Sequence, residues 1–392
     1  MKRISLVFVS NYFNHHQKYL SDCFFQRLGD QYHFIETMPM EEERISMGWE
    51  TFDEKYLLKS YVSDEEAERA QKLINTADVV IFGSANEKLI RRRLNSKKII
   101  FRYSERVFKE KKFYWLKLPF RLFRFRRWNP KSARIYLLCS SAFSSLDYQK
   151  GLGLFWGKCL KWGYFTEAKV FDDLQSLVDG KDFTTILWCG RLVEGKRLKD
   201  VLMAFEIIQK KYSQMRLRVI GGGPLEKEYK EYVAEHGIKN VSFTGSLDPE
   251  TVRTEMERSG FFVFSSSFEE GWGAVVNEAM NSACAVIAGH AAGSVPFLIK
   301  NQENGFVFES GNVQSLAETL MSAIQFVSKS KKVCANAYST IVNLWSPVVA
   351  ADRFLEVCKA AMEGGNPTVL FKEGPCSQAD IIEEDWFSHY DD

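Results

Sequence analysis

The sequence Glu270-Gly-Trp-Gly-Ala-Val-Val-Asn-Glu278 decides the fold. It follows the apolar run Phe-Phe-Val-Phe at residues 261–264, which predicts a short buried strand. Gly271 and Gly273 then allow a tight turn into a predicted helix. A strand that turns through glycines into a helix start presents free backbone N–H groups and a partial positive charge. The stretch therefore predicts an α/β domain with a phosphate site at the end of a strand.

A second loop of this kind carries two cations. The apolar run of residues 185–189 predicts a strand, and the apolar spacing of residues 198–212 predicts a helix. The loop Gly190-Arg191-Leu-Val-Glu-Gly-Lys196 lies between them. Two fixed cations there, Arg191 and Lys196, suit a diphosphate leaving group, whose developing charge must be stabilised. A solvated basic loop is the alternative interpretation.

Two more predicted strands end in turn-forming residues. Residues 217–220 run into Gly-Gly-Gly-Pro at 221–224, where glycines let the backbone approach a ligand closely, although such a run also occurs in plain turns. Residues 241–245 run into Ser-Leu-Asp-Pro at 246–249, which predicts another helix start. Four strand-to-loop patterns thus follow one another in the second half of the chain.

Taken together, these patterns resemble retaining glycosyltransferases of family 4, of the bacterial surface-polysaccharide type, over residues 183–345. In that family two glutamates are separated by seven residues around a Gly-aromatic-Gly turn, as Glu270 and Glu278 are here. The resemblance implies that Glu270 orients the transferred sugar, that Glu278 binds the ribose, and that the loop with Leu247 lies beside the base. The residues then expected in the donor site are Gly190, Arg191, Lys196, Gly222, Gly223, Leu247, Glu270, Gly271, Trp272, Gly273, Ala274 and Glu278, of which Arg191, Lys196 and Glu270 are the expected catalytic residues.

The first half also alternates predicted strands and helices, which indicates a doubly wound parallel sheet with ligands at the carboxyl ends of its strands. Its last strand is expected at residues 134–139. The resemblance implies the GT-B fold, an α/β class in which two Rossmann-like domains face each other across a cleft. The expected parts are an acceptor-binding domain at 1–165, a nucleotide-sugar domain at 166–345, a crossover helix at 346–362 that braces the first domain, and an acidic tail at 363–392.

Two places in the first half are candidates for additional site residues. His15 and His16 follow the first predicted strand, where many family members have a glycine-rich loop. These histidines either hold a phosphate or an acceptor hydroxyl, or simply begin a helix. Glu105 follows another predicted strand, where many family members have a histidine close to the transferred sugar. It either takes over that role as a catalytic residue or pairs with Arg102 or Arg106.

Composition is that of a globular protein of two or three domains. The 392 residues are 45% hydrophobic and 26% charged, with a net charge of +2. Eight scattered cysteines without a C-x-x-C motif are typical of a reduced, intracellular protein. No apolar run reaches the roughly 18 residues that a membrane span needs, and no signal peptide is recognised. A cytoplasmic location is therefore expected.

Between Arg106 and Arg134 the sequence has eleven Lys and Arg residues and one acid, Glu110, interleaved with aromatic and leucine residues. This composition suits the surface of an anionic membrane, so peripheral attachment to the inner face of the cell membrane is expected. Single-stranded nucleic acid is a competing partner, but no nucleic-acid motif is present. A solvated helix would leave many aromatics exposed. The tail, with eight acids and one lysine, is expected to be mobile.

These observations predict a retaining glycosyltransferase that uses a nucleoside-diphosphate sugar, with a UDP-sugar as the expected donor. A lipid-linked glycan is the expected acceptor. No metal is expected, because no Asp-x-Asp lies at a strand end, and Arg191 and Lys196 would neutralise the diphosphate instead. A nonhydrolysing nucleotide-sugar epimerase has the same architecture and stays open. So does a non-catalytic nucleotide-sugar-binding protein, which would not need both cations and both glutamates.

Overall fold

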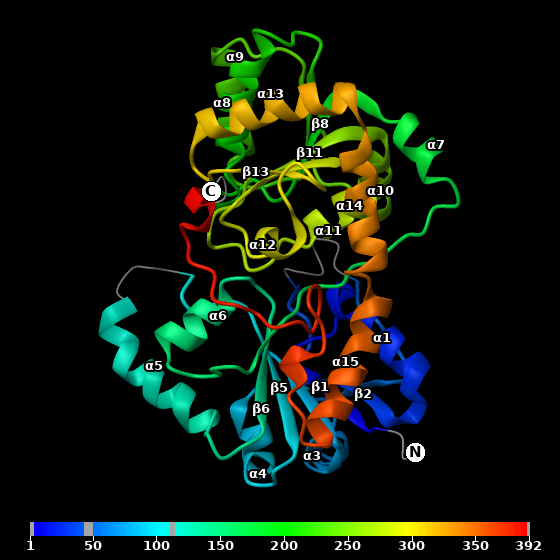
Figure 1. The fold of residues 1–392 in the computed structure, drawn as a ribbon, viewed down its shortest axis with the longest axis vertical. Helices are drawn as coiled ribbons and strands as arrows, with labels where there is room; N and C mark the ends of the chain where they lie inside the picture. The colour runs from blue at the N-terminus through cyan, green and yellow to red at the C-terminus, as the bar shows by residue number, and fades with distance from the viewer. Residues whose placement is uncertain (1–3, 43–49, 110–113, 390–392) are drawn as a thin grey trace. The chain divides into compact units, whose positions relative to one another are not determined.

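The computed structural model describes residues 4–42, 50–109 and 114–389. The chain divides into two compact units (Figure 1). The first unit consists of Met1–Thr166 and Pro347–Glu383, and the second of Glu167–Ser346 and Glu384–Asp392. The chain therefore passes from one unit to the other three times, and each unit combines segments that are distant in sequence.

In the first unit the described residues form a seven-stranded parallel sheet in the order β3-β2-β1-β4-β5-β6-β7. Its strands are β1 (Leu6–Ser10), β2 (Tyr32–Glu36), β3 (Leu57–Lys59), β4 (Val79–Phe82), β5 (Ile99–Ser104), β6 (Ile135–Cys139) and β7 (Cys159–Lys161). The central strands β1 and β4 are buried along their whole length. Their apolar sequence, which only Ser10 at the end of β1 interrupts, is typical of a parallel sheet that is covered on both faces.

The helices of the first unit come from both ends of the chain. They are α1 (His15–Leu28), α3 (Asp64–Thr76), α4 (Arg91–Leu94), α5 (Tyr114–Trp128), α6 (Ser144–Leu146) and α15 (Pro347–Met362). Phe354 of α15 packs its ring against Phe24 of α1 and Phe101 of β5, with centroids 5.6 and 4.9 Å apart. Arg27 of α1 also forms an ion pair with Asp352. The helix expected at 346–362 is therefore α15, and it packs into the first unit.

Arg93 holds together several backbone segments of the first unit. Its guanidinium is buried and donates hydrogen bonds to the carbonyl oxygens of Ile74, Ala77, Asp78 and Ile99 at 2.7–2.9 Å. Burial lowers the pKa of Arg93 to about 10, so the side chain stays charged at neutral pH. Because a buried carbonyl without a donor is costly, this one side chain satisfies the end of α3 and the starts of β4 and β5 at once.

The second unit contains a six-stranded parallel sheet in the described residues, in the order β10-β9-β8-β11-β12-β13. Its strands are β8 (Asp182–Cys189), β9 (Arg216–Ile220), β10 (Val241–Phe243), β11 (Ser259–Phe264), β12 (Ala285–Gly289) and β13 (Phe306–Phe308). Its helices are α7 (Leu174–Asp179), α8 (Leu198–Gln209), α9 (Glu226–Glu235), α10 (Pro249–Arg258), α11 (Val275–Asn281), α12 (Val295–Leu298), α13 (Val313–Lys329) and α14 (Lys332–Asn343). Helices cover both faces of this sheet (Figure 1).

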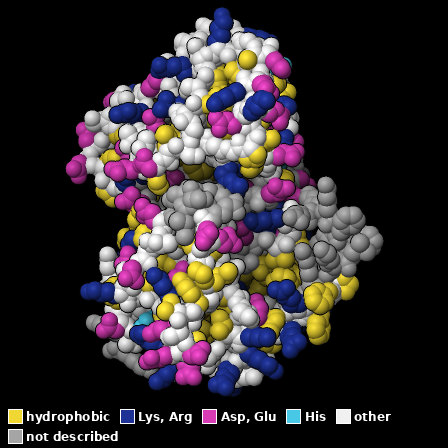
Figure 2. Space-filling model, turned by 180° about the vertical axis from the view of Figure 1, so that it is seen from behind, with side chains coloured by type: hydrophobic (Ala, Val, Ile, Leu, Met, Phe, Trp, Pro, Cys, Tyr) yellow, Lys and Arg dark blue, Asp and Glu magenta, His cyan; other side chains and the backbone are white. Residues whose placement is uncertain are grey.

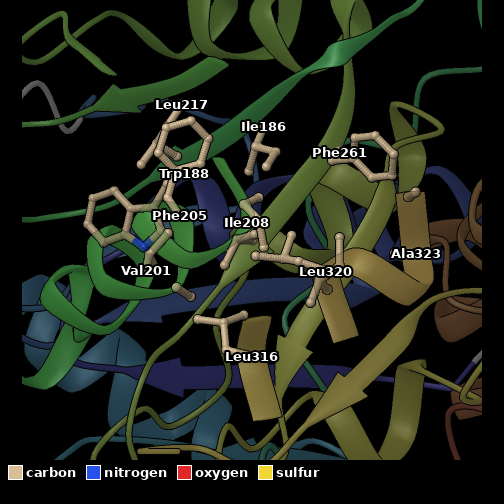
Figure 3. Packing of buried hydrophobic residues seen from close by; sticks show 14 of the residues in the cluster. Ile186, Trp188, Val201, Phe205, Ile208, Leu217, Phe261, Leu316, Leu320 and Ala323 are labelled. Atoms are coloured by element: carbon tan, nitrogen blue, oxygen red, sulfur yellow. The ribbon is translucent and has the colours of Figure 1, made fainter. Parts of the chain in front are cut away.

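A continuous core lies between this sheet and the helices α8 and α13. Trp188 of β8, Phe205 of α8 and Leu320 of α13 are each at most 2% exposed and belong to one cluster of buried side chains (Figure 3). The apolar residues of α8 recur at helical spacing because one of its faces must be buried against the strands. This core fixes β8 and β11, whose carboxyl ends carry the candidate site.

The structure confirms the α/β class with two parallel-sheet Rossmann-like units, and it corrects the end of the first sheet. The expectation that residues 134–139 form the last strand of this half was wrong, because β7 pairs in parallel with β6. At three residues, β7 has too few positions to show a strand periodicity. Within the described residues, no helix combines the length and the apolar character that a membrane crossing requires.

Part of the tail that the sequence predicts to be mobile makes defined backbone contacts with the first sheet. Ser377 accepts a hydrogen bond from the backbone N–H of Lys161 at 2.7 Å, and Ala379 donates one to Cys159 at 3.0 Å. The tail thus runs antiparallel to β7, with a bridge between Leu160 and Gln378. Its backbone hydrogen bonds satisfy the open edge of the first sheet.

Candidate functional site

Four loops meet the carboxyl edge of the second sheet, where ligands bind in open α/β sheets. They follow β8 (residues 190–197), β9 (221–225), β11 (265–274) and β12 (290–294). Ser267 donates from its backbone N–H to the carbonyl of Gly195 at 3.0 Å, which ties the third loop to the first. Ser294 donates likewise to Trp272 at 3.2 Å, which ties the fourth loop to the third.

The glycines of the second loop are required by contact with the first loop. Gly221 has a φ of 130°, and a Cβ there would lie 1.9 Å from the carbonyl oxygen of Gly190. A Cβ on Gly223 would lie 2.6 Å from the carbonyl oxygen of Leu192. The close backbone approach inferred from the glycine run is therefore an approach to residues 190–192 of the chain itself. Gly222 faces Ser246, and a Cβ there would lie 3.3 Å from its Oγ.

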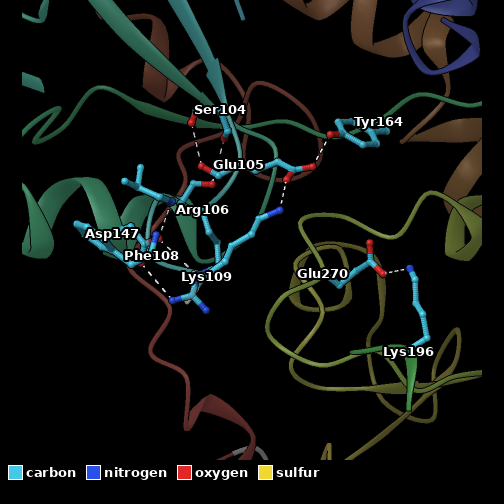
Figure 4. A network of polar contacts seen from close by, with 11 residues as sticks. Ser104, Glu105, Arg106, Phe108, Lys109, Asp147, Tyr164, Lys196 and Glu270 are labelled. Atoms are coloured by element: carbon cyan, nitrogen blue, oxygen red, sulfur yellow. Dashed lines mark hydrogen bonds and ion pairs between the residues drawn. The ribbon is translucent and has the colours of Figure 1, made fainter. Parts of the chain in front are cut away.

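Lys196 and Glu270, which the sequence places 74 residues apart, form an ion pair (Figure 4). Their side chains are 29% and 18% exposed, so both remain within reach of a ligand. Ser265 fixes the backbone at this point, because its Oγ donates to the Lys196 carbonyl at 2.7 Å. Ser265 is itself held by the indole N–H of Trp188 at 3.0 Å. The structure thus joins one expected cation to one expected carboxylate.

Arg191 lies on the same loop, and its side chain is exposed. Among the described residues it has no ion-pair partner. Leu247 is half-buried in the loop before α10, whose N-cap is Asp248. The structure therefore leaves the Arg191 guanidinium open to an anion, whereas Leu247 offers an apolar surface.

Glu278 lies in α11, eight residues after Glu270, and its carboxylate is without a hydrogen-bond partner in the described part of the chain. Burial raises the pKa of Glu278, and the positive charge of Arg253 opposes that shift. The Arg253 guanidinium donates hydrogen bonds to the backbone carbonyl of Glu278 at 3.0 Å and to the side-chain oxygen of Asn281. A desolvated carboxylate of this kind favours donors such as sugar hydroxyls.

The turn between the two glutamates owes its shape to packing. Trp272 is fully buried, and its indole donates to the Asn277 side chain at 2.8 Å. It belongs to the core, so at most the backbone of Trp272 can face a donor. Gly273 has a φ of 88°, and a Cβ there would lie 2.4 Å from the ring of Phe264. Gly271 is buried, whereas Ala274 is half-buried as the N-cap residue of α11.

In the first unit, Glu105 is the centre of a polar group at the end of β5 (Figure 4). Its carboxylate pairs with Lys109 and accepts a hydrogen bond from the hydroxyl of Tyr164. The predicted alternatives, pairing with Arg102 or Arg106, were wrong. Arg102 pairs with Glu87, and Arg106 with Asp147.

Tyr164 is a further candidate site residue, which no sequence pattern predicts. Its ring stacks on His16 with centroids 5.0 Å apart, and its hydroxyl reaches Glu105, which is 59 residues away in the sequence. No local pattern marks it, since it lies in an irregular segment after β7. His15 and His16 are the first two residues of α1, whose N-cap is Asn14. Burial lowers the pKa of His15 to about 4, so this imidazole is neutral at pH 7 and can offer hydrogen bonds but no charge.

Part of the basic segment between Arg106 and Arg134 is internal. The Arg106 side chain is 3% exposed in its pair with Asp147, and Arg134 donates to the Ala361 carbonyl of α15. Residues 110–113 and the side chains of 114–118 and 121 lie outside the described residues. Helix α5 carries a group of exposed residues, which we call the α5 patch: Pro119, Phe120, Phe123, Arg124, Arg126 and Arg127. Figure 2 shows exposed hydrophobic side chains on the side of the first unit where α5 lies.

Comparison with known proteins begins with the second unit. Residues 171–340 match the family model described as "Glycosyl transferases group 1". An uncharacterized glycosyltransferase of Haemophilus influenzae is 30% identical over 137 residues, which are 35% of this chain and 38% of that protein. The capsular polysaccharide biosynthesis glycosyltransferase CapM of Staphylococcus aureus is 28% identical over 173 residues, 42% of this chain and 43% of that protein. The chain thus spans less than half the length of these curated relatives.

A solved structure extends the likeness to both units. The crystal structure of Anabaena Alr3699/HepE in complex with UDP superposes with a TM-score of 0.68 over 91% of this chain and 100% of that one, at 13% identity. A sequence identity of 13% shows a shared fold only. Residues 171–340 are thus similar to glycosyl transferases group 1, and the two Rossmann-like units match the GT-B fold of solved structures.

Proposed function

We propose that this protein is a retaining glycosyltransferase that moves a sugar from a UDP-sugar to a hydroxyl of a lipid-linked glycan in bacterial polysaccharide synthesis. The observation that carries the proposal is the grouping of two cations and two glutamates at the carboxyl edge of one parallel sheet. Arg191, Lys196 and Glu270 lie on its loops, and Glu278 lies on α11, which follows one of these loops. The UDP complex of the Anabaena structure supports the choice of base. The capsular enzyme CapM supports the choice of process.

In this proposal the two cations act on the leaving group. The bond between the sugar C1 and the diphosphate oxygen breaks, and the acceptor oxygen forms a bond to C1 on the same face. The acceptor proton passes to the departing diphosphate, so no separate base is required. Lys196 and Arg191 stabilise the charge that develops on the diphosphate. The exposure of Arg191 and the position of Lys196 beside Glu270 support the assignment of both cations to the leaving diphosphate.

The two glutamates take different parts of the donor. Glu270, on the loop beside Lys196, orients the sugar hydroxyls. Glu278, without a hydrogen-bond partner among the described residues, accepts from the ribose hydroxyls. On the acceptor side we assign Glu105, with His15 and His16 as further contacts to an acceptor hydroxyl. The neutral His15 fits a hydroxyl better than a phosphate.

The proposal is tested by binding and transfer with defined donors. Thermal shift and calorimetry with UDP-, GDP- and CDP-sugars are expected to select a UDP-sugar, and the product of transfer should keep the anomeric configuration of the donor. EDTA is expected to leave the rate unchanged. A rate that EDTA abolishes and magnesium or manganese restores would contradict the metal-free proposal. Epimerisation of the UDP-sugar without any acceptor, followed by NMR, would support an epimerase instead.

Glu278→Gln is expected to weaken donor binding about tenfold, with little change in turnover, because it removes a charged acceptor of ribose hydrogen bonds. The pKa of Glu278 is raised by burial, so donor affinity of the wild type should fall as the pH is lowered through that raised value. The donor affinity of the Glu278→Gln variant should not show this fall at low pH. Glu270→Gln is the comparison, since it should lower turnover more than affinity. Identical effects of both changes on affinity alone would contradict the assignment.

We further propose that the α5 patch attaches the protein to an anionic membrane. Phe120 and Phe123 are 70% and 66% exposed, which is unusual for aromatic side chains, and three exposed arginines lie on the same helix. Arginines beside an apolar surface favour the interface of anionic lipids.

Changing Arg124, Arg126 and Arg127 to Ser is expected to weaken binding to anionic vesicles on the order of 100-fold, at about 1 kcal/mol for each charge. Flotation with phosphatidylserine-containing and neutral vesicles measures this, and added salt should weaken the wild type. The control changes two exposed arginines of α4, Arg91 and Arg92, to Ser. The membrane role of the α5 patch would be contradicted if the wild type bound neutral and anionic vesicles equally well. An equal loss of vesicle binding in the control variant would contradict it too.

A further inference from the structure

The last described residues of the chain pack onto His290, at the carboxyl end of β12. The indole N–H of Trp386 donates to the backbone carbonyl of His290 at 3.1 Å. The ring of Phe387 stacks on the His290 imidazole, with centroids 5.5 Å apart and planes at 24°. Both residues belong to the short helix Trp386–His389, which is part of the second unit. Two aromatic side chains from the C-terminal segment therefore contact the same histidine.

His290 is fixed from several sides. Its imidazole Nδ1 accepts from the backbone N–H of Ser310 at 2.9 Å, and the backbone N–H of His290 donates to the Phe308 carbonyl at 3.0 Å. A further hydrogen bond links the imidazole to the backbone of Glu384. Burial lowers the pKa of His290, while the nearby Glu309 and Glu384 oppose the shift. The neutral imidazole suits these contacts, because only an unprotonated Nδ1 can accept from Ser310.

A second aromatic contact connects His290 to the proposed donor site. The ring of Phe268 meets the imidazole edge to face, with centroids 5.5 Å apart at 83°. Phe268 lies two residues before Glu270, on the loop after β11. The adjacent Ser267 holds that loop against Gly195, where a Cβ would lie 2.8 Å from the Glu269 carboxylate. The imidazole therefore contacts the rings of Trp386 and Phe387 from the C-terminal segment and the ring of Phe268 from the loop that carries Glu270.

We propose that Trp386 and Phe387 are positioning residues of the donor site: they hold His290, which supports Phe268 and so keeps the Glu270 loop against the Lys196 loop. The effect on catalysis rests on the proposed transferase function, whereas the coupling between the C-terminus and the loop is a property of the chain alone. Glu278, on α11, lies outside these contacts. Loss of the C-terminal contacts should therefore disturb Glu270 more than the proposed ribose contact.

The coupling is measured by hydrogen exchange in the full-length protein with Trp386 and Phe387 both changed to Ala. Losing the two aromatic contacts to His290 and one hydrogen bond should raise exchange of residues 265–271 and of the Ser310 amide about tenfold, whereas β9 stays protected. Phe387→Tyr keeps a ring on the imidazole and should exchange like the wild type. Asp385→Asn, which changes an exposed side chain next to the helix, is the matched control. If the double variant is poorly folded by circular dichroism, Phe387→Ala alone replaces it, because it retains the indole hydrogen bond.

The kinetic arm uses UDP alone and the UDP-sugar selected by thermal shift. The double alanine variant should lose about tenfold in kcat while its Kd for UDP changes less than about threefold, and Phe387→Tyr should recover the wild-type kcat. Unchanged exchange at residues 265–271 in the alanine variants would overturn the positioning role. Raised exchange in a protein whose wild type binds no UDP or UDP-sugar would instead refute the transferase proposal and leave the coupling intact. A loss confined to the UDP Kd would also overturn the role, because it would mean that the segment supports nucleotide binding rather than Glu270.

Discussion

Lys196→Ala is expected to lower the turnover of sugar transfer by about 10²–10³-fold while the protein stays folded. The physical reason is that a cation aimed at a leaving diphosphate gains strength as charge develops, and removing such a contact costs about 2–4 kcal/mol in the transition state. Lys196 is anchored for this task, since Ser265 holds its backbone and Glu270 holds its ammonium. Arg191→Ala should show an effect of the same kind, and kcat and KM are measured with the preferred donor.

Lys199→Ala is the matched control for Lys196. It removes a neighbouring lysine of α8 that is half exposed and pairs with Glu228 at the surface. Its turnover should equal that of the wild type, because exposed ion pairs contribute little. If Lys196→Ala and Arg191→Ala both transferred sugar at near wild-type rates, the diphosphate would have to lie elsewhere.

Arg93→Ala is expected to destabilise the first unit by about 3–5 kcal/mol. The change removes the Arg93 donor from four backbone carbonyls, of which that of Ala77 keeps a bond from Lys98 Nζ at 3.3 Å, and it creates a cavity where the guanidinium was. Urea unfolding followed by circular dichroism measures the loss, and a transition that begins with the first unit is expected.

Arg92→Ala provides the comparison on the same short helix. Its side chain is exposed, so the free energy of unfolding should change by less than about 0.5 kcal/mol. Equal stability of both variants would mean that water or neighbouring donors satisfy the four carbonyls in place of Arg93.

Much of the fold follows from local patterns in the sequence. Residues 186–188 of β8 and 261–264 of β11 are apolar and buried because both faces of their sheet are covered, so the alternation of such runs with helices predicts a doubly wound parallel sheet. Strand β7 could not be found in the same way. Its three residues carry no period, and its neighbours in space are β6 and a tail segment more than 200 residues away.

The candidate site was predictable in its loops but not in its contacts. Positions such as Lys196 and Glu278 follow from strand-to-helix turns, whereas the pairing of Lys196 with Glu270 depends on tertiary structure. Trp272 shows the limit most clearly. An aromatic residue between two glycines suggests contact with a ligand, yet its indole bonds to Asn277 inside the core. Tyr164 and His290 were missed because only the fold brings their partners to them.

The threefold passage of the chain between the units has a practical consequence for protein engineering. Neither unit is a continuous piece of sequence. Residues 347–383, which include α15, belong to the first unit, and residues 384–392 belong to the second. A fragment that stops at Thr166 would expose the rings of Phe24 and Phe101 that Phe354 covers. Chimeras that exchange the first unit with that of a relative should therefore carry residues 347–383 along with residues 1–166, so that α15 and its native partners stay together.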